Sequence, residues 1–131
     1  MSQENVEIVR AALDALNRGD GDAALKDMAP DFEFDFSRSI GTQPGVYRLD
    51  ETRRFLDEFT GAWESVRWEA DDFIEADEQV LTSLTTSFRG RDGIEVQARA
   101  AWVWTFRDGS VARISFYQER HEALEAAGLS E

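Results

Sequence analysis

The sequence EVQARAAWVWTFR, at residues Glu95–Arg107, alternates between two sets of side chains almost without interruption. A period of two is typical of a β-strand with one buried face. At roughly 3.3 Å per residue this strand would span about 43 Å, which is longer than most strands, so we expect it to bend around a core or a pocket. The face that we expect to be buried carries small residues first and large aromatic residues last: Val96, Ala98, Ala100, Trp102, Trp104 and Phe106.

The length and composition of the chain limit the kinds of protein that it can form. A chain of 131 residues can bury one core, so we expect residues 1–131 to form a single domain. The absence of cysteine excludes disulfides and thiolate sites. The net charge of −13 disfavours nucleic acid as a partner, since phosphate backbones are repelled. The N-terminus does not resemble a signal peptide, and no apolar run is long enough to span a membrane, so we expect a cytoplasmic protein.

Helices are predicted in the first half of the chain. The first starts with Ser2 as its N-cap and ends before Gly19, which suits the left-handed position after a helix. The second starts at Asp22 and runs through Met28, because Pro30 prevents its continuation. The apolar stripe of the first helix has spacings of three and four residues: Val6, Val9, Leu13 and Leu16.

A third helix follows a long irregular segment. Residues 37–49 contain glycine and proline without a period, and we expect a loop that forms a flap over one end of the core. Asp50 is the predicted N-cap of the third helix, and Gly61 marks its predicted end. Its apolar stripe consists of Phe55, Leu56, Phe59 and Trp63.

The remaining segments have the pattern of strands. Residues 31–36, DFEFDF, place three phenylalanines on one face. Further strands are predicted at 66–75 with a bulge near its end, at 80–89, at 95–107 and at 111–120, the last two joined by an Asp-Gly hairpin. Residues 121–128 read as a short helical or irregular tail. Three helices followed by a run of hairpins predict an α+β fold, with the helices on one face of a strongly curved antiparallel sheet.

The order of these elements resembles the SnoaL-like branch of the nuclear transport factor two-like (NTF2-like) superfamily. The resemblance rests on EIVRAALDALNRGDGDAALKDMAPDFEFDF, PGVYR, ETRRFLDEF and AWVWTFRDGSVARISFYQER, which cover nearly the whole chain. It implies a cone-shaped fold with a deep apolar pocket between the sheet and the helices. It also implies a homodimer formed through the convex face of the sheet. Because this superfamily holds enzymes and non-catalytic proteins alike, the fold alone does not give a function.

The catalytic residues of the resembling enzymes are mostly missing. The positions that correspond to the acid, base and tyrosine of ketosteroid isomerase hold Trp102, Phe36 and Ala12. A SnoaL-type cyclase is expected to use an acidic residue in the last strand, where this chain has Gln118, which does not exchange protons near neutral pH. The Asp-Arg-Asp set of limonene epoxide hydrolase has no counterpart facing inward in the last strands.

The sequence supports a pocket lined mainly by aromatic side chains, although the same residues would also fill an ordinary core. Buried indole N–H groups need hydrogen-bond partners, so at least one of the two tryptophans of the long strand is expected to face a cavity or a water molecule. Gln118 is the expected polar anchor. The residues predicted to line the pocket are Leu16, Phe34, Phe36, Phe55, Phe59, Trp102, Trp104, Ile114, Phe116 and Gln118.

Other ionisable groups are candidates for catalysis or metal binding. Asp35 points away from the pocket by alternation, and only a bulge would turn it inward to act as a base with a raised pKa. His121, the only histidine, is expected to be a solvated surface residue. Asp71 and Asp72 are adjacent in a strand and would point to opposite faces, so we expect no metal site and no cofactor.

Three functions remain open from the sequence. The leading hypothesis is a domain that binds a small, largely apolar molecule in the cone. The second is a cyclase, isomerase or hydratase of polyketide-like or cyclic ketone substrates, which would use Asp35 or a water molecule held by Gln118. The third is a non-catalytic dimeric interaction module with a filled cone.

Overall fold

The computed structural model describes residues 2–38 and 44–129. The side chain of Ser2 and the middle of the predicted flap, residues 39–43, lie outside the described part. None of the described helices is long and apolar enough to cross a bilayer. The elements are, in chain order, α1 (Ser2–Asn17), α2 (Gly21–Leu25), β1 (Met28–Asp35), β2 (Val46–Arg48), α3 (Leu49–Gly61), β3 (Ser65–Ala76), β4 (Gln79–Arg89), β5 (Glu95–Arg107), β6 (Ser110–Tyr117) and α4 (Arg120–Ala126).

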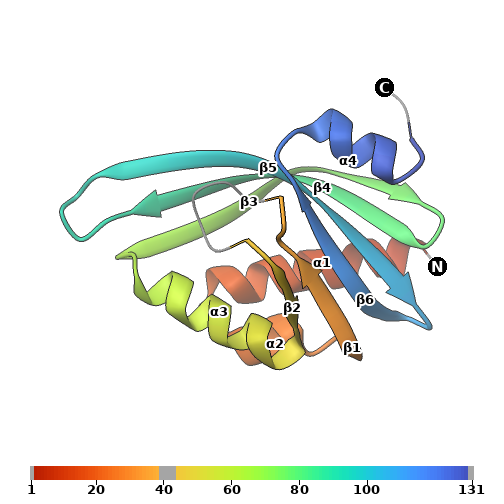
Figure 1. Ribbon diagram of the computed structural model, residues 1–131, viewed down its shortest axis with the longest axis horizontal. Helices are drawn as coiled ribbons and strands as arrows, with labels where there is room; N and C mark the ends of the chain where they lie inside the picture. The colour runs from red at the N-terminus through yellow and green to blue at the C-terminus, as the bar shows by residue number, and fades with distance from the viewer. Residues whose placement is uncertain (1, 39–43, 130–131) are drawn as a thin grey trace.

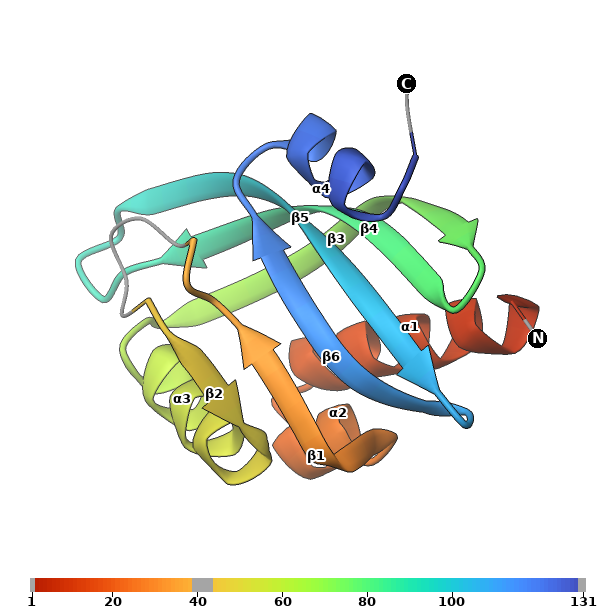
Figure 2. The ribbon, with the colours of Figure 1, turned by 45° about the vertical axis from the view of Figure 1, so that its right-hand side comes forward.

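All six strands form one curved sheet in the order β2-β1-β6-β5-β4-β3. Figures 1 and 2 show α1, α2 and α3 on one side of this sheet and α4 on the other. The predicted α+β architecture, with three helices gathered on one face of the sheet, is confirmed. The pairing is antiparallel as predicted, except between β1 and β6, which run parallel.

The long strand β5 covers Glu95–Arg107, as the alternation predicted. Its first half belongs to a β4–β5 hairpin that projects beyond the helices (Figure 1), so that Val96 on the inner face is 44% exposed. Its second half is buried on both faces, because α4 covers Ala101 and Val103 on the outer side. The turn that follows has Asp108 and Gly109 both at positive φ, 54° and 81°, which is the geometry of a tight Asp-Gly hairpin.

The second helix differs from its prediction at both ends. Its N-cap is Asp20, whose carboxylate accepts a hydrogen bond from the Ala23 N–H at 3.0 Å, and α2 ends at Leu25. Met28 is not in the helix but begins β1, where it pairs with Val111 of β6. The helix therefore ends because the following residues pair with the sheet, and not because Pro30 interrupts it.

The third helix begins two residues earlier than predicted. Arg48 and not Asp50 occupies the N-cap, and the side chain of Glu51 accepts the Arg48 N–H at 2.9 Å. The short strand β2 immediately before it was missed by the sequence analysis because three residues carry too little periodicity. The predicted ends at Gly19, which has a φ of 74°, and at Gly61 are confirmed.

The bulge predicted in the second half of β3 is present, although it lies between Ala70 and Asp72 rather than at Phe73 and Ile74. It restores Phe73 to the inner face, opposite Thr82, and turns Ile74 to the outer face, opposite Leu81. The bulge thus lets one strand contribute to the cores on both sides of the sheet.

The side chain of Asn17, at the end of α1, is bonded to the backbone of the edge strand β3. Its Nδ2 donates to the Trp68 carbonyl and its Oδ1 accepts the Trp68 N–H, each at 2.8 Å. An edge strand otherwise presents unpaired backbone groups to its surroundings. Asn17 therefore makes the two hydrogen bonds that a neighbouring strand would otherwise make with Trp68, and it fixes the backbone at this residue.

We expect Asn17→Ala to lower the free energy of unfolding by about 1–3 kcal/mol, because two backbone groups of Trp68 lose their partners in a partly buried place. Urea denaturation followed by circular dichroism measures the change. Gln97→Ala is the control, since Gln97 makes a longer, exposed hydrogen bond of 3.4 Å to Ser87. Equal losses in the two variants would contradict the importance of the Asn17 contact.

Candidate functional site

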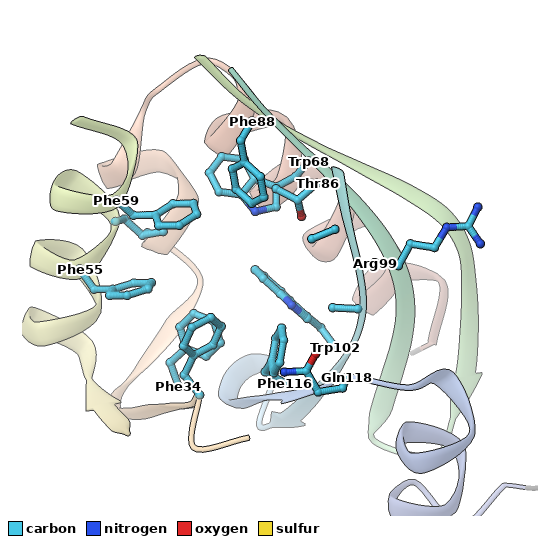
Figure 3. A pocket seen from close by; sticks show the side chains of 14 residues that line it. Phe34, Phe55, Phe59, Trp68, Thr86, Phe88, Arg99, Trp102, Phe116 and Gln118 are labelled. Atoms are coloured by element: carbon cyan, nitrogen blue, oxygen red, sulfur yellow. The ribbon is translucent and has the colours of Figure 1, made fainter. Parts of the chain in front are cut away.

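A pocket of about 210 Å³ lies between α3 and the concave face of the sheet. Figure 3 shows rings from α3 on one side and from the strands on the other, pointing toward a common space. The residues that line the pocket are Phe34, Phe36, Phe55, Leu56, Phe59, Trp68, Thr86, Phe88, Ala98, Arg99, Ala100, Trp102, Phe116 and Gln118.

Regular spacing within each element brings these rings together. Phe55 and Phe59 are one turn apart on α3 and lie nearly parallel, with centroids 5.8 Å apart. Phe34 meets Trp102 edge-on at 5.3 Å, and Phe36 lies 4.7 Å from Phe116. Edge-on and offset contacts of this kind stabilise the wall itself. The small side chains of Ala98 and Ala100 on β5 leave the space that the rings surround.

Most of the predicted lining residues are in this pocket, but Leu16, Trp104 and Ile114 are not. These three help to line a separate space of about 20 Å³ beside α1 and α2, whose wall also includes Phe34 and Trp102. Trp104 is 1% exposed, and its indole N–H donates to the Thr82 hydroxyl at 3.2 Å. The prediction that both tryptophans of β5 line the main pocket is therefore corrected: Trp102 lines it, whereas Trp104 reaches only the small inner space and is packed in the core.

The polar groups at the pocket are few. The indole nitrogens of Trp68 and Trp102 have no hydrogen-bond acceptor among residues 2–38 and 44–129. Gln118 donates its Nε2 to the Arg38 carbonyl at 2.9 Å, which fixes the amide at the edge of the pocket (Figure 3). Arg99 contributes its inner portion only, because its guanidinium points away from the pocket in Figure 3.

Asp35 does not line the pocket. It is 4% exposed, and its carboxylate accepts hydrogen bonds from Arg113 at 2.7 Å, the Ser37 N–H at 3.0 Å and Arg38 at 3.1 Å. Burial alone would raise the pKa of Asp35, but the hydrogen bonds from Ser37 and Arg113 and the positive charge of Arg38 outweigh it and lower the pKa to about 2. Asp35 points to the outer face, as alternation predicted, and the alternative in which a bulge turns it inward to act as a base is overturned.

The structure does not assemble a metal centre from the side chains that it describes. No group of three or more histidine, aspartate or glutamate residues within 2–38 and 44–129 is arranged to hold an ion. His121 lies in α4, where it is exposed, on the opposite side of the sheet from the pocket.

A comparison with protein families matches residues 9–114 to the SnoaL-like domain. The chain belongs to the SnoaL-like family. No match was found among the curated proteins.

Solved structures show that this SnoaL-like domain has the NTF2-like fold. TerC, co-crystallised with polyporic acid, is 21% identical with a TM-score of 0.78, over 95% of this chain and 98% of TerC. An NTF2-like protein from Burkholderia thailandensis is 26% identical with a TM-score of 0.74, over 86% and 88% of the two chains. An LEH-like epoxide hydrolase from M. tuberculosis is 20% identical with a TM-score of 0.73, over 90% of this chain and 84% of the hydrolase.

Strands were predicted at residues 66–75 and 80–89, but the part of this SnoaL-like pocket that they supply was not. Trp68, Thr86 and Phe88, which lie on β3 and β4, line the pocket and were not among its predicted residues. The register now explains their position, because Trp68 pairs with Thr86, and Thr86 in turn pairs with Ala98 of β5. The pairing of strands was predictable from the hairpins, so this signal was present in the sequence.

Proposed function

We propose that this protein binds a small, largely apolar, ring-containing molecule in the pocket between α3 and the sheet. The observation that carries the proposal is the space of about 210 Å³ surrounded by aromatic side chains. Ligand sites are typically concave and mostly apolar, with a few polar groups that fix orientation. Because pockets for drug-sized ligands have volumes of roughly 300–1,000 Å³, this pocket suits a compact molecule of one or two rings.

Binding is favoured over acid–base catalysis because of the chemistry of the pocket wall. General acid–base catalysis needs a titratable group within hydrogen-bond reach of the reacting atom. The one ionisable residue among the described lining residues is Arg99, whose charged end points away from the pocket. Asp35 is on the other face of the sheet and is held as an anion by its partners.

The crystal structure of TerC with polyporic acid supports the proposal, since it pairs this fold with a small organic molecule. Conversion of a cyclic ketone with the help of a water molecule is the second candidate function. It is supported by Gln118, because the bond to Arg38 uses its Nε2 and leaves the amide oxygen available. Turnover of a cyclic ketone by the purified protein would favour this second candidate.

The binding proposal is tested with 2-acetylnaphthalene as a probe. We expect the probe to raise the melting temperature of the wild-type protein, because a ligand that binds only the native state stabilises it by about 2.7 kcal/mol at one hundred times its Kd. In Ala98→Trp this stabilisation should be lost, since the new indole occupies the pocket from the exposed end of β5.

Gln97→Trp is the matched control for this experiment. Gln97 is the neighbour of Ala98 on the same exposed strand segment, but it points to the opposite face of the sheet. We expect this variant to keep the stabilisation by 2-acetylnaphthalene. If the probe stabilises Ala98→Trp as much as the wild type, or stabilises none of the three proteins, the pocket is not the binding site.

A further inference from the structure

We propose that the ligand carries a neutral hydrogen-bond acceptor, such as the carbonyl oxygen of an aryl ketone or a quinone, and that this oxygen accepts the indole N–H of Trp102. This inference depends on the binding proposed above and specifies the chemical class of the ligand.

The two tryptophans on the inner face of β5 differ in how their N–H groups are used. Trp104 donates to Thr82 inside the packed core. Trp102, two residues earlier on the same face, is 7% exposed and has no acceptor among residues 2–38 and 44–129. Buried indole N–H groups usually have a partner. The side chain of Trp102 thus carries a donor that the described protein does not use.

The nitrogen of Trp102 is also not sealed inside the protein. Among the described residues, Asp72 Oδ1 is the only fully enclosed side-chain polar atom that has no hydrogen-bond partner. The indole nitrogen of Trp102 therefore has free space beside it, and Figure 3 shows the ring in the middle of the pocket. Trp68 lies near Phe88 at the other end of the pocket and is 5% exposed. Its indole N–H likewise has no acceptor among the described residues. Both donors are held on strands.

The charge of the protein selects a neutral acceptor over an anion. No guanidinium or ammonium group among the described lining residues faces the pocket, because the charged end of Arg99 points away. The net charge of the chain is −13. A carboxylate would lose its hydration in such a pocket without gaining a charged partner, which is costly. A carbonyl oxygen loses less hydration free energy than a carboxylate, and a hydrogen bond from one indole N–H compensates for that loss.

A purely hydrocarbon ligand would also fit the walls but would leave the N–H of Trp102 without a partner. Water can satisfy this donor when the pocket is empty, and a ligand that displaces the water without replacing its hydrogen bond loses affinity. The cost of leaving a buried donor unpaired is the physical basis for selecting a ketone over a hydrocarbon of the same shape.

The test compares 2-acetylnaphthalene with 2-isopropenylnaphthalene, in which a CH₂ group replaces the carbonyl oxygen. We expect the ketone to bind about tenfold more tightly to the wild-type protein, the ratio that corresponds to one unmade hydrogen bond. In Trp102→Phe, which keeps an aromatic ring but has no N–H, the ratio should fall toward one. Trp63→Phe should keep the ratio, because Trp63 contacts Phe88 but does not line the pocket.

A second measurement observes the indole N–H groups directly. The four tryptophans give four indole cross-peaks in a ¹H–¹⁵N spectrum of the wild-type protein, and Trp102→Phe identifies the one from Trp102. The ketone should move this peak downfield, as hydrogen bonding does, whereas the hydrocarbon should not.

The outcomes separate the two proposals. Equal affinity of the two probes, or a ratio that persists in Trp102→Phe, would overturn the acceptor proposal while leaving the binding proposal intact. Loss of the ratio in Trp68→Phe alone would overturn the assignment to Trp102. If neither probe shifts any indole peak or the melting temperature, the proposed binding function itself fails.

Discussion

Trp104→Ala is expected to lower the free energy of unfolding by about 3–5 kcal/mol, the cost of removing a large aromatic side chain from a packed core. Trp104 is 1% exposed and is the largest of the fully buried side chains. Because domains of this size are stable by only about 5–15 kcal/mol, the variant should be close to unfolding at room temperature. Urea denaturation at 15 °C and 25 °C would measure the loss.

Two further variants make this result specific to the core. Trp63→Ala should cost much less, since Trp63 packs beside Phe88 at the end of α3 and is only partly buried. Thr82→Val should cost about 1–3 kcal/mol, because it leaves the indole N–H of Trp104 without its acceptor. A loss below about 1 kcal/mol for Trp104→Ala would show that this side chain faces open space and not a filled core.

The second large effect is a dependence of stability on pH that originates at Asp35. Its pKa is about 2 in the folded protein and 3.8 for an ordinary aspartate. A carboxylate whose pKa is lowered on folding contributes stability that is complete above the ordinary pKa and disappears as the pH falls through the folded value. The shift corresponds to about 2 kcal/mol, which should be lost progressively between pH 4 and pH 2.

Asp35→Asn isolates this contribution from that of the other carboxylates. At pH 7 the variant should be less stable than the wild type by about 2 kcal/mol or more, because Arg113 and Arg38 lose a buried anionic partner. The difference between the two proteins should shrink as the pH approaches 2, as measured by urea denaturation across this range. A difference that is constant from pH 7 to pH 2 would show that the charge of Asp35 does not stabilise the fold.

The sequence predicted the parts of the fold that depend on periodicity. The bounds of β5 and the inward direction of Phe34 and Trp102 follow from alternation, and the end of α1 at Gly19 follows from turn chemistry. Alternation also placed Asp35 correctly on the outer face. Each of these predictions depends on neighbouring residues alone, which is why the sequence was sufficient.

The site was predicted less well because it depends on contacts between distant segments. Alternation assigns Trp102 and Trp104 to one face, but only the packing of distant elements determines that Trp102 reaches the main pocket while Trp104 does not. The network around Asp35 brings Arg113 to a residue 78 positions earlier in the chain, which no local pattern indicates. A short helical or irregular segment was predicted at residues 121–128, where α4 lies, but a short apolar segment does not reveal which face of the sheet it will cover.

The position of α4 limits how two copies of this chain can associate. Its residues Ala123 and Leu124 already cover Leu81, Ala101 and Val103, so the least polar part of the convex surface is not free for a second molecule. What stays uncovered toward the tip of the β4–β5 hairpin carries charged and amide side chains on its outer face: Arg67, Glu69, Arg89, Glu95, Gln97 and Arg99. Self-association through that region would depend on ionic pairing between chains of high negative charge, and raising the salt concentration should change its strength measurably.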